Sequence, residues 1–280
     1  MRKLLKRKLI LYVVLNIIPL HAAVSQEGYH IPKAVMVPAN DRPHQLHTET
    51  GYGEGFYIGL SYSVSNKFTI LVDGFRQDER RTYKTIFGSK RRTEISDFVL
   101  RFGLARSYPV NIQKISLFEV ILGSAYSHVD RTSYFLPVNV LPKDYTETDY
   151  LSIFAQSNLV IAKNKYKVTF SLRISGSFYD KVLYYEIYSA PNKEKLENFM
   201  ILSADPAVSF NYTIIKNVEL VSQAGLSMQI SHNRFASEGP MSYSETEYKT
   251  MSLLYKIGIQ YKLSFDNNRE VYTLSKRGIY

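Results

Sequence analysis

Residues 251–265 read MSLLYKIGIQYKLSF, and an apolar side chain occupies every second position from Met251 to Phe265. The residues in between are mostly polar or small, with Leu254 as the exception. Successive side chains of a β-strand point to opposite faces. The alternation therefore predicts a strand that separates an apolar from a polar environment. The run is longer than the ~9–11 residues with which a strand crosses a bilayer.

The same alternation recurs along the chain, as in YKVTFSLRIS from Tyr166 to Ser175. There we expect Tyr166, Val168, Phe170, Leu172 and Ile174 to face outward, with Lys167 and Arg173 inward. The nine strands expected on this basis are 54–64, 67–76, 95–107, 115–128, 148–162, 165–178, 200–214, 217–232 and 250–265.

The connections between these strands alternate in length. The long ones are 77–94, 129–147, 179–199 and 233–249, and this asymmetry is typical of membrane barrels with short periplasmic turns and long external loops. An even strand number requires one more strand, for which residues 28–38 are the candidate. The expected fold is all-β: a transmembrane antiparallel up-and-down barrel of 10 strands, within a range of 8 to 12. A soluble exported barrel with an apolar ligand inside would show the same alternation, but not the loop asymmetry.

The N-terminus has the order of a secretory signal. Basic residues at positions 2–8 precede an apolar run from Leu9 to Leu20, and small residues follow at Ala22 and Ala23. The run is shorter than the ~20 residues of a spanning helix, which favours a signal peptide over an uncleaved anchor. We expect cleavage after residue 23, or as late as 25, and no lipid anchor, since the chain has no cysteine.

Taken together, the chain resembles small outer-membrane β-barrel proteins of the porin-like kind. The resemblance rests on the signal at 1–23, on the glycine-aromatic opening GYGEGFYIG at 51–59, and on the terminal strand. It implies a barrel over 28–265, a periplasmic tail over 266–280, and an outer-membrane location. It also implies that the barrel-assembly machinery reads the terminal strand through Tyr255, Ile257, Ile259, Tyr261, Leu263 and Phe265.

Charged residues on the polar faces are expected to line the lumen. Both signs occur in similar number, and an unpaired charge in a narrow lumen would cost several kcal/mol. We therefore favour a closed barrel held by ion pairs over a charge-lined pore. The candidates are Glu54, Asp73, Asp97, Arg101, Glu119, Lys167, Arg173, Asp205, Glu219, Lys256 and Lys262.

One expected external loop is strongly basic. Its guanidinium and ammonium groups could bind the phosphates of lipopolysaccharide, although a solvated loop explains the same composition. The residues are Arg76, Arg80, Arg81, Lys84, Lys90, Arg91 and Arg92.

Other functions find less support in the sequence. His128 and His232 follow serines near expected strand ends, and Glu238, Glu245 and Glu247 follow in the next loop, which leaves a lipid hydrolase as the alternative activity. No hydrolase motif, phosphate loop or dinucleotide fingerprint is present, and His44 and His47 are too few for a metal site. The 35 basic and 25 acidic residues include five basic and no acidic ones in 1–23, so the mature net charge is +5, which does not favour nucleic acid. We expect no enzyme activity and no cofactor.

Overall fold

The computed structural model describes residues 33–36, 43–53, 55–84, 90–112, 115–136, 144–163, 165–186, 193–231, 234–239, 242–247 and 251–265. They form twelve strands: β1 Gln45–Gly53, β2 Gly55–Ser63, β3 Phe68–Lys84, β4 Lys90–Ile112, β5 Ile115–Leu136, β6 Asp144–Lys163, β7 Tyr166–Glu186, β8 Lys193–Ile215, β9 Val218–Gln229, β10 Arg234–Gly239, β11 Ser242–Glu247 and β12 Met251–Ser264.

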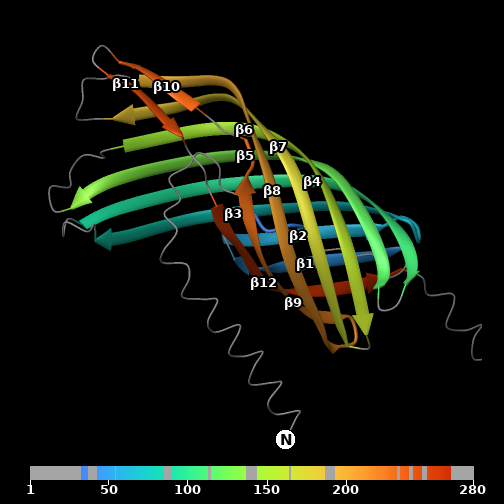
Figure 1. The fold of residues 1–280 in the computed structure, drawn as a ribbon. Helices are drawn as coiled ribbons and strands as arrows, with labels where there is room; N and C mark the ends of the chain where they lie inside the picture. Colours follow the sequence, from blue (N-terminus) through green and yellow to red (C-terminus); the bar gives the residue numbers. More distant parts are fainter. Residues whose placement is uncertain are drawn as a thin grey trace, which may run out of the picture.

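Ten of these strands close into a barrel in the order β1-β12-β9-β8-β7-β6-β5-β4-β3-β2 (Figure 1). Every pairing is antiparallel, and β1 closes the ring against β12, with Gln45 opposite Ser264. The short turns after β2, β4, β6 and β8 lie at one end, which we assign to the periplasm. The expected ten-strand antiparallel barrel is confirmed.

Side-chain burial alternates along the strands as the sequence predicts. On β7, Phe170, Leu172 and Ile174 are exposed, whereas Arg173 is buried in the interior. The exposed apolar face continues around the barrel, and aromatic residues mark its two rims. The upper rim carries Tyr52, Phe56, Phe98, Tyr126 and Phe178, and the lower rim carries Phe68, Tyr108, Tyr166, Tyr212, Tyr261 and Phe265. Such a band between two aromatic girdles is the lipid-facing surface of a transmembrane barrel.

No helix in the described ranges is long and apolar enough to cross a membrane.

The first barrel strand is not the one expected from the sequence. We predicted residues 28–38, but the strand that completes the barrel is β1, whose nine residues pair with both β2 and β12. Its sequence, QLHTETGYG, has weak alternation because small and polar residues stand on its outer face. Within the range 28–38, the structure describes Lys33–Met36, which form no strand.

The long connections are also shorter than expected. The range 77–94 is largely a paired hairpin, because β3 and β4 stay in register out to Lys84 opposite Lys90. The strands β3 to β8 likewise continue past the upper aromatic girdle (Figure 1), and β10 and β11 form a separate two-stranded sheet. Beyond the membrane both faces of a strand meet water, so apolar alternation ends although backbone pairing does not.

The glycine-aromatic opening is explained by one close contact. Gly51 of β1 lies opposite Gly258 of β12, and a Cβ on Gly258 would overlap the Tyr57 hydroxyl and the Thr50 carbonyl. The ring of Tyr57 therefore covers a glycine pair at the seam where the barrel closes. The same ring stacks on Phe75, with centroids 5.5 Å apart.

Candidate functional site

The inside of the barrel is occupied by a stretch of the chain itself. Residues Lys33–Met36, called the lumen segment below, precede β1 and are at most 3% exposed. They lie against side chains from β3, β4, β5, β6 and β7. The sequence analysis missed this role, because a short run of mixed polarity was read as a weak strand.

At its N-terminal side the segment is held by an ion pair. Lys33 Nζ lies 2.5 Å from Asp97 Oδ2 and donates a hydrogen bond to Gln77 Oε1 at 3.2 Å. The Lys33 and Asp97 side chains are 2% and 0% exposed. A buried pair of this kind is costly to break, because the remaining charge is left without a partner.

The backbone of the lumen segment is bound by wall side chains. Arg173 Nη2 donates to the Lys33 carbonyl at 2.6 Å, and Arg101 Nη1 donates to the Ala34 carbonyl at 2.5 Å. Gln156 binds Met36 twice, accepting from its N–H at 3.2 Å and donating to its carbonyl at 2.7 Å. These contacts satisfy backbone groups that burial would otherwise leave unpaired.

The two arginines are themselves held in place by carboxylates. Arg101 Nε and Nη2 both lie 2.7 Å from the Asp73 carboxylate. Arg173 Nε lies 2.7 Å from Asp205 Oδ2, and the Ser227 hydroxyl donates to the other Asp205 oxygen. Each guanidinium thus joins the wall to the lumen segment.

Apolar contacts complete the fit. Ala34 packs with Tyr57, Phe75, Val99 and Ala125. Met36 packs one level further down with Leu71, Ala105, Ile121 and Phe154, where its sulfur would touch any Cβ placed on Gly103.

Two small cavities lie beside the segment. One cavity between Lys33, Arg101, Arg173 and the serines of β5–β7 measures about 40 Å³, and another beside Met36 measures about 30 Å³. A single water molecule needs about 10–15 Å³ on this scale. In the part of the lumen that the structure describes, each of these two cavities has room for a few waters and none for a larger solute.

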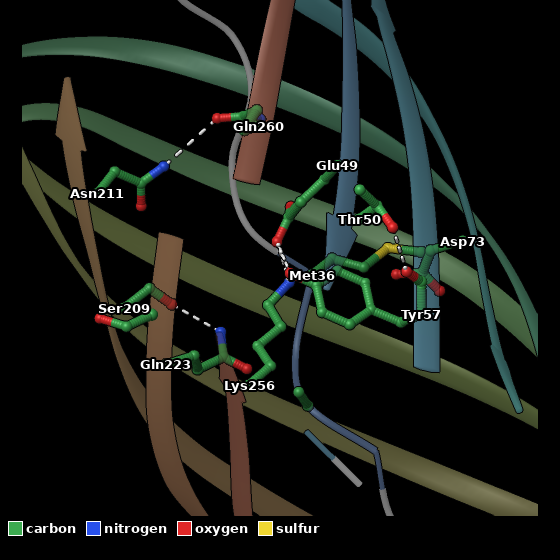
Figure 2. A network of polar contacts seen from close by, with 12 residues as sticks. Met36, Glu49, Thr50, Tyr57, Asp73, Ser209, Asn211, Gln223, Lys256 and Gln260 are labelled. Carbon is green, nitrogen blue, oxygen red and sulfur yellow. Dashed lines mark hydrogen bonds and ion pairs between the residues drawn. The ribbon is translucent and has the colours of Figure 1, made fainter. Parts of the chain in front are cut away.

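The opposite side of the lumen is filled by a polar network (Figure 2). Lys256 Nζ lies 2.9 Å from Glu49 Oε1, and the Tyr57 hydroxyl donates to the same carboxylate at 2.7 Å. Further down, Lys262 Nζ lies 2.7 Å from Glu219 Oε1. Asn211, Gln260, Ser209 and Gln223 continue the network through their amides and hydroxyls.

The structure places the predicted lumen charges on inward-facing positions. Six of the predicted residues form three pairs with each other: Arg101 with Asp73, Arg173 with Asp205, and Lys262 with Glu219. Glu119 accepts hydrogen bonds from Ser107 and Asn158, and Lys167 stands on the inner face of β7. Glu54 lies outside the described residues.

Sequence reasoning missed Glu49 and Lys33. With them, the described lumen from Asp97 downward holds as many acidic as basic groups. The acids are Glu49, Asp73, Asp97, Glu119, Asp205 and Glu219, and the bases are Lys33, Arg101, Lys167, Arg173, Lys256 and Lys262. Without Lys33 of the lumen segment, the acidic groups of this list would outnumber the basic groups by one.

The basic stretch expected as a loop lies in strands. Arg76, Arg80, Arg81 and Lys84 belong to β3, whereas Lys90, Arg91 and Arg92 belong to β4. On the outer face, Arg76 pairs with Asp78 at 2.9 Å and Arg80 with Glu94 at 3.2 Å, both with exposed guanidiniums. Glu94 also binds Arg92, so this face carries both signs of charge.

His128 lies on the outer face just above Tyr126, outside the membrane band. Its Nδ1 is 2.9 Å from Asp149 Oδ1 and its Nε2 is 3.3 Å from Asp130 Oδ2. The hydrogen bond to Asp149 raises the pKa of His128 above its ordinary value of 6.5. Ser127 points to the opposite face and is buried, so the neighbouring serine cannot serve His128 as a nucleophile.

His232 falls outside the described residues, and Glu238, Glu245 and Glu247 belong to β10 and β11. His47 is in β1 rather than in a loop, buried against Gln45 and Gln260, whereas His44 is exposed. The described ranges contain no group of three residues able to hold a metal ion.

The terminal strand is placed as the sequence predicts. Ile257, Ile259, Tyr261 and Leu263 of β12 are exposed on the outer face, and Phe265 follows them at 63% exposure. Tyr255 stands on the same face and is half-buried. The tail 266–280 lies outside the described residues.

A closed, even-numbered antiparallel barrel with an apolar outer band, two aromatic girdles and a polar interior is an outer-membrane-type β-barrel. The chain is therefore an outer-membrane β-barrel protein, with its lumen occupied by a segment of its own N-terminal region.

Known structures include barrels similar to this one. The outer membrane protease OmpT of Escherichia coli matches with a TM-score of 0.49 and 8% identity, over 78% of this chain and 93% of that one. The translocator domain of the autotransporter NalP of Neisseria meningitidis matches with a TM-score of 0.41 and 10% identity, over 78% and 85%. CarO of Acinetobacter baumannii matches with a TM-score of 0.32 and 10% identity, over 80% and 99%. No protein-family model and no curated protein sequence matches the chain. The class follows from the geometry of the barrel itself.

Proposed function

We propose that this protein is a closed outer-membrane barrel with a structural or surface-interaction role, and that it forms no open diffusion channel. The main support for this proposal is the lumen segment inside the barrel. Its Lys33 side chain is bound by Asp97, and its backbone carbonyls are bound by Arg101, Gln156 and Arg173. A porin with an aqueous channel needs a lumen free of such a plug.

The contacts of the lumen segment argue for a stable closure. Its withdrawal would leave Asp97 buried without Lys33 and would remove the backbone acceptors of two guanidiniums. Hydrogen bonds to charged groups contribute about 1.5–3 kcal/mol each, and breaking a buried ion pair costs about 3–5 kcal/mol. The closed state is favoured because several such contacts would be lost together.

Conductance in a planar lipid bilayer tests this proposal. Purified wild-type protein should give little or no single-channel current. Deletion of residues 26–40 removes the lumen segment while β1 to β12 remain, and this variant should conduct. Deletion of residues 267–280 is the matched control, since it shortens the chain at the other terminus and should leave the barrel closed.

Large, steady current steps from the wild-type protein would refute the closed-barrel proposal. Silence of the variant lacking residues 26–40, in a barrel that is folded by its heat-dependent gel mobility, would show that the wall side chains alone close the lumen. That outcome would contradict the proposed role of the lumen segment as a plug.

We further propose that the outer face above the girdle touches lipopolysaccharide phosphates. Arg76 and Arg80 support this, because their side chains are 70% and 76% exposed next to the lipid-facing band. Asp78 and Glu94 compete for the same arginines, so the contact is expected to be weak. The double variant Arg76→Gln, Arg80→Gln should retain less lipopolysaccharide on purification than wild type, whereas Lys163→Gln at the periplasmic end should retain the normal amount.

The two alternative functions are less well supported. A soluble barrel that binds an apolar ligand would bury Phe170 inside, but Phe170 is exposed on the outer face. A lipid hydrolase would need a serine within reach of a rim histidine, and the partners of His128 are the two carboxylates of Asp130 and Asp149.

A further inference from the structure

The lumen segment has a direction. Along β3, Lys33 binds Gln77, Ala34 belongs to the same buried cluster as Phe75, and Met36 belongs to the same cluster as Leu71. Because β3 runs from the periplasmic to the external end, these contacts descend from the external side toward the periplasm.

Two neighbouring strands give the same direction independently. On β4, which runs downward, Lys33 pairs with Asp97, Val99 belongs to the cluster of Ala34, and Ala105 belongs to the cluster of Met36. On β5, which runs upward, Ala125 belongs to the cluster of Ala34 and Ile121 to that of Met36. Lys33 therefore lies nearer the external mouth than Met36.

The chain after the segment confirms that Met36 faces the periplasmic end. His44 precedes β1 at the lower rim, where its carbonyl accepts a hydrogen bond from the Phe265 N–H at 3.2 Å. His44 therefore lies at the end of the barrel toward which Met36 is directed, and β1 runs upward from there.

We infer that the chain preceding Lys33 leaves the barrel through its external mouth, so that the N-terminal end of the mature protein is displayed at the cell surface while Phe265 lies at the periplasmic end. The N-terminal end and Phe265 then lie on opposite sides of the outer membrane. This inference concerns chain direction and holds whether or not the lumen conducts.

The available chain length suffices for this path. The wall above Asp97 continues along β4 to Lys90, a stretch of seven residues that rises by at most ~23 Å at ~3.3 Å per residue. Residues 26–32, which the expected cleavage after 23 or 25 would leave in the mature chain, span up to about 23 Å when extended. Strand tilt shortens the vertical distance further, so the chain can reach the rim.

Cysteine labelling tests the inference directly, because the protein has no cysteine of its own. Glu27→Cys is introduced into the full chain, and intact cells are treated with a membrane-impermeant polyethylene glycol maleimide. Ser237→Cys in β10 serves as the external control, and Lys216→Cys in the turn between β8 and β9 serves as the periplasmic control. The mass of the purified protein establishes that residue 27 is present in the mature chain.

We expect Glu27→Cys to be labelled on intact cells, as Ser237→Cys is, and Lys216→Cys only after the outer membrane is permeabilised. Labelling of Glu27→Cys only after permeabilisation would place the N-terminal end in the periplasm and overturn the inference. Labelling of Glu27→Cys only after denaturation would place residue 27 inside the barrel and would also overturn the inference. Bilayer conductance plays no part in this readout, so the inference can fail while the closed-barrel proposal stands.

Discussion

Arg173 links the barrel wall to the lumen segment, and its removal is expected to destabilise the barrel strongly. The Arg173 and Asp205 side chains are 7% and 1% exposed. Arg173→Met keeps a long apolar side chain but leaves the Asp205 carboxylate with Ser227 as its remaining charge-stabilising partner. Loss of one member of a buried pair costs about 3–5 kcal/mol. The hydrogen bond to the Lys33 carbonyl is lost as well, although the two effects do not simply add.

A second arginine pair provides the matched control for this prediction. Arg76 and Asp78 have the same bond type at 2.9 Å, but their side chains are 70% and 58% exposed. Arg76→Met should therefore lower the free energy of unfolding by about 0–1 kcal/mol. Both variants are compared by guanidinium titration of the refolded protein in lipid vesicles, with heat-modified gel mobility as the measure of the folded barrel.

The double variant Arg173→Met, Asp205→Leu separates charge from packing. It removes both buried charges, so it should recover most of the stability lost in Arg173→Met. Equal unfolding free energies for Arg173→Met and Arg76→Met would refute the reasoning. A double variant no more stable than Arg173→Met would show that the unpaired carboxylate is not the cause.

Three further outcomes are expected. Phe265→Ala should reduce outer-membrane insertion, measured by membrane fractionation, whereas deletion of residues 267–280 should be mild; the reverse order would mean that the barrel closes further along the chain. Gly258→Ala should lower the unfolding free energy by more than about 1 kcal/mol, since its methyl group meets a tyrosine ring and a carbonyl and overpacking costs about 1–3 kcal/mol; a neutral result would contradict the tight seam. The hydrogen bond to Asp149 raises the pKa of His128 above 6.5, so this contact stabilises the barrel fully below pH 6.5 and is lost as the pH rises through the raised value. Stability measured against pH should lose this dependence in Asp149→Asn, and an unchanged profile would assign it to other groups.

The closed barrel explains why the lumen charges are tolerated. Arg101 and Arg173 each contact both a carboxylate and a backbone carbonyl. A guanidinium presents several donors in a fixed plane and can satisfy two partners at once. Lysine would present its three donors from a single nitrogen and would lack the separate coplanar donors with which each arginine reaches both the wall and the segment.

Alternation of apolar and polar residues was enough to identify the barrel, its lipid-facing side and the inward position of residues such as Arg173 and Lys256. The reason is that within the membrane a strand separates two different environments, and each side chain must suit one of them. Where that contrast is absent the sequence was misread. β1 has small and polar residues on its outer face, and the upper parts of β3 and β4 have water on both sides.

The tertiary structure alone decided what fills the barrel. Nothing in the pattern near Lys33 distinguishes a weak strand from a segment inside the lumen, since both are short and of mixed polarity. The pairing of Lys33 with Asp97 joins residues far apart in the chain, and it depends on how strand tilt and register bring β3, β4 and β7 around one point. Periodicity determines which way a side chain faces, whereas its partner inside a closed barrel is determined by the three-dimensional register of every strand around it.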